Sequence, residues 1–100
     1  MIVDISEDAE FELEDIGDYI ARKGSPKRAE TFVEELEAAC MGLADMSFVF
    51  PLIPRYEHHG IRHRVHGNYQ IFYRVIEASG RIDVLHILNS RRDHISILFS

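Results

Sequence analysis

Cysteine, lysine and long apolar runs are the scarcest features of this 100-residue sequence. The single cysteine, Cys40, excludes an internal disulfide and suits a reducing compartment. No apolar run approaches the length of a membrane span, and the N-terminus lacks the basic start and long apolar stretch of a signal peptide. We therefore expect a soluble, cytoplasmic protein. Cys40 lies on an apolar helical stripe, so we expect a buried structural thiol.

Internal repeats, low-complexity tracts and linker-like segments are also missing from the sequence. With 100 residues, 46% of them hydrophobic, the chain can build one compact domain with a small core, and nothing in it suggests two domains. We therefore expect a single domain over residues 1–100.

The net charge of −6 conceals a strong asymmetry between the two halves of the chain. Residues 1–50 hold thirteen Asp or Glu against four Lys or Arg, whereas residues 51–100 hold four Asp or Glu against seven Arg and all six histidines. Because affinity for phosphates comes largely from cations, we expect the chain alone to bind nucleic acid poorly. A local basic edge formed by the second half is the alternative, because fields within about a Debye length matter more than the total charge.

The first half predicts a strand followed by a hairpin of two helices. Met1–Ile5 alternates loosely and predicts a short strand. Ser6 is a candidate N-cap, followed by acidic residues and by apolar residues at helical spacing. Gly24 is placed to end this helix, and Ser25 can cap a second one, predicted over Pro26–Asp45.

The second half predicts a connection and three strands. Ser47–Gly60 contains two prolines and is a poor candidate for helix or strand. Runs of β-branched and aromatic residues, separated by turns at Gly67-Asn68 and Ser79-Gly80, predict strands over Ile61–His66, Tyr69–Ile76 and Arg81–Asn89. We expect an α+β fold of order βααβββ, with the helix hairpin on one face of a mostly antiparallel sheet of about four strands.

Both faces of the predicted sheet are apolar if the last two strands alternate strictly. One face would then carry Tyr69, Ile71, Tyr73, Val75, Ile82, Val84 and Leu88. The other would carry Phe72, Ile76, Leu85 and Ile87. Because the helix hairpin can cover only one face, either the tail Ile95–Phe99 or a partner must cover the other.

The second half also resembles a known family. Residues Ile61–Asp93 combine an arginine-led strand, the core Gly-Asn-Tyr-x-Ile-Phe-Tyr-Arg-Val over Gly67–Val75, and a closing Arg92-Asp93. In these features the chain resembles the ParE branch of the ParE/RelE toxin superfamily. The first half agrees, because its opening helix fits the family at Ala9, Leu13, Ile16, Tyr19, Ile20 and Ala21.

The resemblance implies a toxin of a type II toxin–antitoxin module. It implies inhibition of DNA gyrase by direct binding, with stabilisation of the cleaved gyrase–DNA complex, and neutralisation by a ParD-like antitoxin in a toxin–antitoxin hetero-oligomer. It implies neither catalytic residues nor a cofactor. We expect an antitoxin segment, disordered when free, to cover the groove beside the helix hairpin and the face bearing Phe72, Ile76, Leu85 and Ile87.

Five arginines form the strongest chemical cluster: Arg62, Arg64, Arg74, Arg91 and Arg92. Arg62 and Arg64 share a strand face and Arg74 lies on the adjacent strand, so several guanidinium groups could converge. We expect the target-binding residues to be Arg62, Arg91, Arg92 and Asp93. The alternative is that these arginines pair with Asp83, Asp93, Glu57 or the acidic helices.

A ribosome-dependent mRNA endonuclease of the RelE branch is the alternative function. In that branch basic residues on this sheet bind mRNA and stabilise charge at the cleaved phosphate, and the corresponding set here would be Arg64, His66, Arg74 and Arg92. The tyrosine that the branch tends to place near its C-terminus is replaced by Ile97, Leu98 and Phe99. The only lysines, Lys23 and Lys27, lie at the helix hairpin.

Histidine is the remaining candidate for acid–base chemistry, because its pKa lies near neutrality. His66 shares a face with Arg62 and Arg64, but no histidine is paired with a carboxylate at a recognisable spacing. The histidines of residues 58–63 lack Cys, Asp or Glu companions at ligand spacing, so we expect no metal site. A third interpretation is a non-toxic antitoxin-binding module, because Asn89 stands where ParE members commonly carry histidine.

Overall fold

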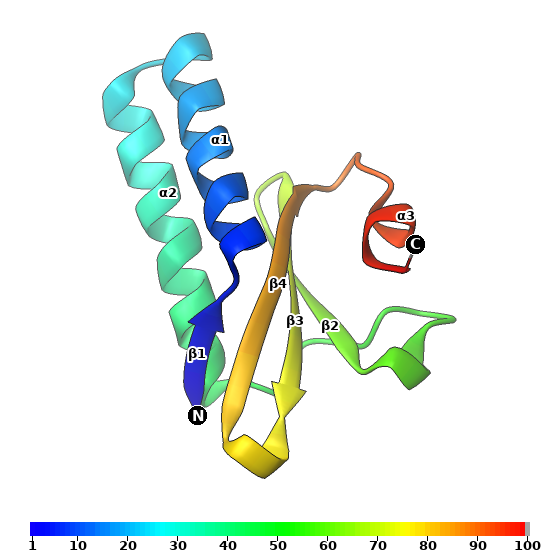
Figure 1. The fold of residues 1–100 in the computed structure, drawn as a ribbon. Coiled ribbons are helices and arrows are strands. Elements are labelled where there is room, and N and C mark those ends of the chain that lie inside the picture. The colour runs from blue at the N-terminus through cyan, green and yellow to red at the C-terminus, as the bar shows by residue number, and fades with distance from the viewer. Residues whose placement is uncertain (100) are drawn as a thin grey trace.

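The computed structural model describes residues 1–99 and contains a four-stranded sheet with helices on both sides (Figure 1). The hairpin of α1 and α2 lies against one side of the sheet, and the short helix α3 lies on the other (Figure 1). The elements are β1 (Ile2–Ile5), α1 (Glu7–Lys23), α2 (Pro26–Met41), β2 (Ile61–His66), β3 (Tyr69–Ile76), β4 (Arg81–Asn89) and α3 (His94–Phe99), with single 3₁₀ turns at Gly42–Asp45, Glu57–His59 and Glu77–Ser79.

The helix boundaries follow from local capping. The hydroxyl oxygens of Ser6 and Ser25 accept hydrogen bonds from the backbone N–H groups of the first turns of α1 and α2, at 3.1 and 3.2 Å. The N–H of Gly24 donates to the carbonyl of Ile20 at 2.8 Å and ends α1. These predicted caps are confirmed. The predicted end of the second helix at Asp45 is wrong, because the α-helix stops at Met41 and tightens into a 3₁₀ turn where glycine disfavours further α-helix.

The strand order in the sheet is β1-β4-β3-β2. β1 lies parallel to β4, whereas β3 is antiparallel to both β2 and β4. Gly67 and Gly80 adopt φ angles of 59° and 64° at the predicted turns, a region that glycine enters without strain. The predicted α+β fold, with a helix hairpin on one face of a mostly antiparallel sheet, is confirmed.

A bulge in β4 reverses the predicted alternation of side chains. Val84 pairs with Tyr73 and His86 pairs with Phe72, so Leu85 is an extra residue in the ladder. Because one extra residue shifts all later side chains to the opposite face, Ile87 joins the core beneath the helices. The next residue, Leu88, follows the same shift and packs on the far face with Phe72. The predicted faces of Ile87 and Leu88 are therefore wrong.

The tail covers the second face of the sheet. Phe72 is 1% exposed, and it lies in a small core with Leu88 and two residues that precede or begin β2, Ile53 and Ile61. The side chains of α3 that pack against this core are Ile95, Ile97, Leu98 and Phe99. The sequence predicted that either the tail or a partner covers this face, and in the structure the tail covers it. The face expected for an antitoxin is thus largely closed, since Phe72 and Ile87 are buried and Ile76 and Leu85 are half-buried.

The main core lies between the helix hairpin and the sheet. Tyr73, Leu36 and Cys40 are each fully buried there, and the hydroxyl of Tyr73 donates to the carbonyl of Ser47 at 2.9 Å. Burial raises the pKa of the Cys40 thiol to about 12, which agrees with the predicted structural thiol. Within residues 1–99, no helix is long and apolar enough to cross a membrane.

Candidate functional site

Arg62 and Arg64 hold the chain's own backbone. The Arg62 guanidinium donates to the carbonyl of Phe50 at 2.7 Å and lies over the Phe48 ring, 5.1 Å from its centroid. The Arg64 guanidinium donates to the carbonyl of Ala39 at 2.9 Å and lies over the Phe50 ring at 4.9 Å. Both side chains therefore tie β2 to the end of α2 and to the segment that follows it.

Arg74 lies on the opposite face of the sheet from Arg62 and Arg64. Arg62 is paired with Tyr73, and because neighbouring residues of a strand point to opposite faces, Arg74 points away from both. Its Nε donates to the carbonyl of His59 at 3.3 Å. The predicted convergence of Arg74 with the other two arginines is wrong.

The exit of β4 presents two exposed arginines on an ordered loop. The side-chain oxygen of Asn89 accepts from the N–H of Arg91 at 2.9 Å, which forms a local turn. The carboxylate of Asp93 accepts from the N–H of Ser96 at 3.2 Å and caps α3. Arg91 and Arg92 are both exposed. Their guanidinium groups are thus displayed by a loop that the neighbouring polar side chains hold in shape.

The clustered arginines are not neutralised by carboxylates in the described part of the chain. Over residues 1–99, none of the five forms an ion pair, whereas Arg81 pairs with Asp83 at 2.6 Å. The alternative in which the cluster is neutralised by nearby acids is therefore wrong for these residues. The positive charge of the second half remains available to a partner.

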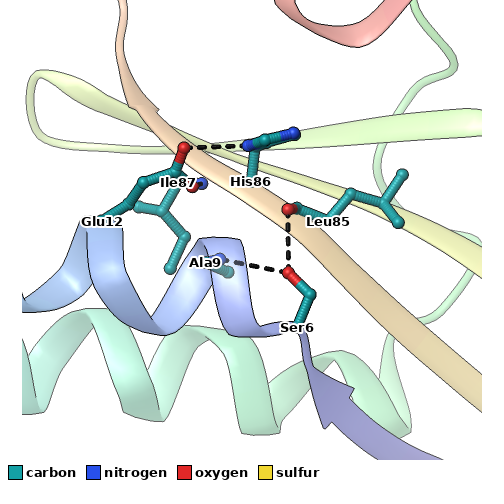
Figure 2. Close-up of polar contacts among 6 residues, drawn as sticks. All are labelled: Ser6, Ala9, Glu12, Leu85, His86 and Ile87. Atoms are coloured by element: carbon teal, nitrogen blue, oxygen red, sulfur yellow. Dashed lines mark hydrogen bonds and ion pairs between the residues drawn. The ribbon is translucent and has the colours of Figure 1, made fainter.

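Two histidines contact carboxylates of the helix hairpin, which the sequence interpretation missed. Nδ1 of His86 lies 2.8 Å from a carboxylate oxygen of Glu12, and the other oxygen of Glu12 accepts from the N–H of Ile87 at 2.8 Å (Figure 2). Nε2 of His66 lies 3.4 Å from the carboxylate of Glu35. Each carboxylate is on a helix and far from its histidine in sequence, so only the tertiary fold brings the pairs together.

Ser6 and Glu12 take the place of a strand beside the C-terminal half of β4. β1 pairs with β4 only as far as Val84. Beyond that point the hydroxyl of Ser6 donates to the carbonyl of Leu85 at 2.9 Å, and Glu12 accepts from Ile87 (Figure 2). Backbone groups around the bulge are therefore satisfied by the side chains of Ser6, the N-cap of α1, and of Glu12 within α1.

A groove of about 540 Å³ lies between the helix hairpin and the β2–β3 turn. We call it the hairpin groove, and its lining residues are Tyr19, Ile20, Lys27, Arg28, Thr31, Phe32, Glu35, Gly67, Asn68 and Tyr69. Two smaller hollows share Tyr19 and Tyr69 with it and reach Arg91 and Arg92. The groove and the exit arginines therefore belong to one continuous surface, with apolar rings at its centre and cations on both sides.

The residues of the hypothetical nuclease set do not assemble into one site. Arg64 and His66 line a hollow beside α2, whereas Arg74 lies on the other face of the sheet. Arg92 lies beyond β4, in a different hollow that it shares with Glu12. Within residues 1–99, no group of three or more His, Cys, Asp or Glu is placed to hold a metal ion.

Comparisons with known proteins give a family, from a family model, and a fold, from solved structures. A family model described as the ParE toxin of the type II toxin–antitoxin system parDE matches residues 3–94. The solved chromosomal ParDE system from P. aeruginosa is 18% identical, with a TM-score of 0.73 over 89% of this chain and 95% of that one. The toxin–antitoxin complex RelBE2 from Mycobacterium tuberculosis is 16% identical, with a TM-score of 0.66 over 88% of this chain and 95% of that one. No curated protein gave a significant match.

Proposed function

The chain belongs to the ParE toxin family of type II toxin–antitoxin systems, and on this premise we propose that it inhibits DNA gyrase by direct binding and is neutralised by a ParD-like antitoxin. The observation that carries the proposal is the dispersal of Arg64, His66, Arg74 and Arg92 over separate parts of the molecule. General acid–base cleavage needs its groups within hydrogen-bond reach of one substrate. Inhibition by binding needs no such assembly.

The target contact of this proposal is centred on Arg91 and Arg92. Both side chains are exposed and lack an ion pair within residues 1–99, so they can form charge-assisted hydrogen bonds with a partner. Arg62 and Asp93, also predicted as target contacts, have structural partners, because one holds the Phe50 carbonyl and the other caps α3. In the proposal they position the surface around the two exit arginines.

The antitoxin contact of this proposal is the hairpin groove. Phe32 and Tyr69 form its apolar wall, with ring centroids 5.6 Å apart, and Lys27 and Arg28 lie at its rim. An amphipathic segment with apolar anchors and acidic flanks would complement this lining. Such a segment would be disordered when free and would order on binding.

Induced expression of the chain, followed by assays of its purified product, tests the proposal. We expect growth inhibition with a DNA-damage response, inhibition of gyrase supercoiling, and intact mRNA on translating ribosomes. Replacing Arg91 and Arg92 by Ala should abolish all inhibition while changing the free energy of unfolding by less than about 1 kcal/mol, because both are exposed. The matched control replaces the exposed pair Arg22 and Lys23 by Ala and should remain inhibitory.

Two other outcomes would replace the proposal. Site-specific cuts in translated mRNA, lost in Arg92→Ala, would assign the chain to the endonuclease alternative. Antitoxin binding without growth inhibition would identify a non-toxic antitoxin-binding module.

A further inference from the structure

The outer edge of β2 is already used for strand pairing by a short segment of the same chain. Pro51–Ile53 runs antiparallel to the first half of β2. The N–H of His63 donates to the carbonyl of Pro51, and the N–H of Ile53 donates to the carbonyl of Ile61, both at 3.1 Å. The first half of this edge is therefore already paired.

The second half of the same edge is left open. Because outward-pointing backbone groups recur at every second residue, the N–H and C=O of Val65 point outward as those of His63 do. Within residues 1–99, the outward groups of Val65 have no backbone partner. Val65 is 61% exposed, so an apolar residue lies at the open part of the edge. An open edge with an exposed apolar side chain is a template for pairing with another chain.

A hollow of about 340 Å³ lies beside this open edge, on the face of the helix hairpin. Its lining includes the small residues Ala38, Ala39 and Gly42 together with Arg64 and His66. Arg64 uses one terminal nitrogen to bind the Ala39 carbonyl, so its other N–H groups can serve a ligand. Side chains of an added strand that point to this face would enter the hollow.

The charge of β2 decides which strand fits. Its six residues include Arg62, His63, Arg64 and His66 and no carboxylate. If β2 paired antiparallel with β2 of a second copy so that Val65 lay opposite Val65, Arg64 would lie opposite His66 of that copy. In the register next to this one, Arg64 would lie opposite Arg64. Arginine directly opposite arginine destabilises a strand pair, and the other register gives Arg64 no carboxylate partner, so self-pairing is disfavoured. An acidic strand matches the edge in charge.

The open edge is also continuous with the hairpin groove. Glu35 lines both the groove and the hollow, and its contact with His66 at 3.4 Å lies on the boundary between them. A chain leaving the groove at Glu35 would therefore meet the edge of β2 directly.

We propose that a segment of the antitoxin leaves the hairpin groove and adds to the edge of β2 as a strand paired at Val65. Acidic side chains of this strand face Arg64 and His66, and an apolar side chain between them packs beside Val65. The inference rests on the proposed antitoxin partner and adds a second, strand-like contact to the groove.

Val65→Pro tests the inference, because proline removes the outward N–H while leaving the hydrogen bonds between β2 and β3 in place. Val65→Thr is the matched control, since it keeps the N–H and a β-branched side chain. The full chain is titrated with the protein encoded by the adjoining gene. We expect Val65→Pro to weaken binding by about tenfold or more and Val65→Thr by less than about threefold.

Amide hydrogen exchange of the unmodified chain provides a measurement that does not depend on folding of the proline variant. On adding the same protein, exchange at Val65 should slow by about tenfold or more. Exchange at Arg64, whose N–H already points to β3, should change little. Equal binding of both variants, or unchanged exchange at Val65, would overturn strand addition and leave groove binding intact. Absence of any binding by the unmodified chain would refute the proposed partner and the inference together.

Discussion

At the scale of single residues, Glu12 has the largest structural role among the acidic side chains of α1. One carboxylate oxygen of Glu12 accepts a hydrogen bond from the N–H of Ile87 at 2.8 Å, and the other lies 2.8 Å from Nδ1 of His86. The Glu12 side chain is 23% exposed. We expect Glu12→Ala to lower the free energy of unfolding by about 2 kcal/mol, because a charge-assisted bond is lost and a half-buried N–H is left without a partner. Urea denaturation measures this change.

Glu14→Ala is the control for this prediction. Glu14 is exposed on the same helix, so its replacement should change the free energy of unfolding by less than about 0.5 kcal/mol. An equal loss in both variants would mean that the carboxylate of Glu12 does not stabilise the bulge.

The residues that were predicted correctly from the sequence act locally. Ser6, Gly24 and Ser25 cap helices through atoms at most four residues away, and such patterns are visible in the sequence. The contact between Glu12 and His86 spans 74 residues. No spacing rule identifies such a pair, because its geometry depends on how α1 crosses β4.

At the scale of elements, α3 acts as the cover of the second core. Phe72 and Leu88 are 1% and 3% exposed beneath it, and the ring of Phe99 stacks on Tyr56 with centroids 4.5 Å apart. Truncation after Asp93 should lower the free energy of unfolding by at least about 3 kcal/mol, because several apolar side chains become exposed together. It should also create binding sites for a hydrophobic dye.

Ser96→Ala is the control for the truncation, since this side chain is exposed on α3. Its stability and dye binding should match those of the unmodified chain. A truncated protein with unchanged melting and no dye binding would show that the sheet does not need this cover.

The element order was predictable because each helix and strand has its own periodicity, but the bulge in β4 was not. Leu85, Ile87 and Leu88 are all apolar, so the hydrophobic pattern of β4 does not identify the residue at which the alternation of side chains shifts. The exposed positions of Arg91 and Arg92 were anticipated from their place after the last strand. The opposite facing of Arg74 could have been predicted, because the two-residue turn at Gly67-Asn68 places His66 opposite Tyr69 and therefore Ile61 opposite Arg74.

At the scale of the whole molecule, charge is divided between an acidic helix layer and a basic sheet. Lys27 and Arg28 are exceptions, because these cations of the first half lie at the rim of the hairpin groove. Replacing both by Ala should slow association with an acidic antitoxin by about tenfold at low salt and weaken its salt dependence. Stopped-flow or surface-binding kinetics at about 0.05 and 0.3 M salt measure this effect.

The rate at which the same double variant dissociates from the antitoxin should change much less than its association rate, because exposed charges at the rim act mainly on the encounter of the two proteins. The pair Arg22 and Lys23, exposed at the end of α1 outside the groove lining, serves as the control. Salt-independent association of the unmodified chain would contradict electrostatic steering.

On the proposed function, the parallel pairing of β1 with β4 also affects when the target-binding surface can form. Ile2–Ile5 is synthesised well before its partner, residues 81–84, because the two segments lie far apart in the sequence. Contacts between such distant segments form slowly, because a long loop must close before they contribute stability. The exit arginines follow β4 directly, so the surface proposed to bind the target is completed after synthesis. On the proposed function, a nascent chain that still lacks β4 and the exit arginines therefore has no complete surface with which to bind the target.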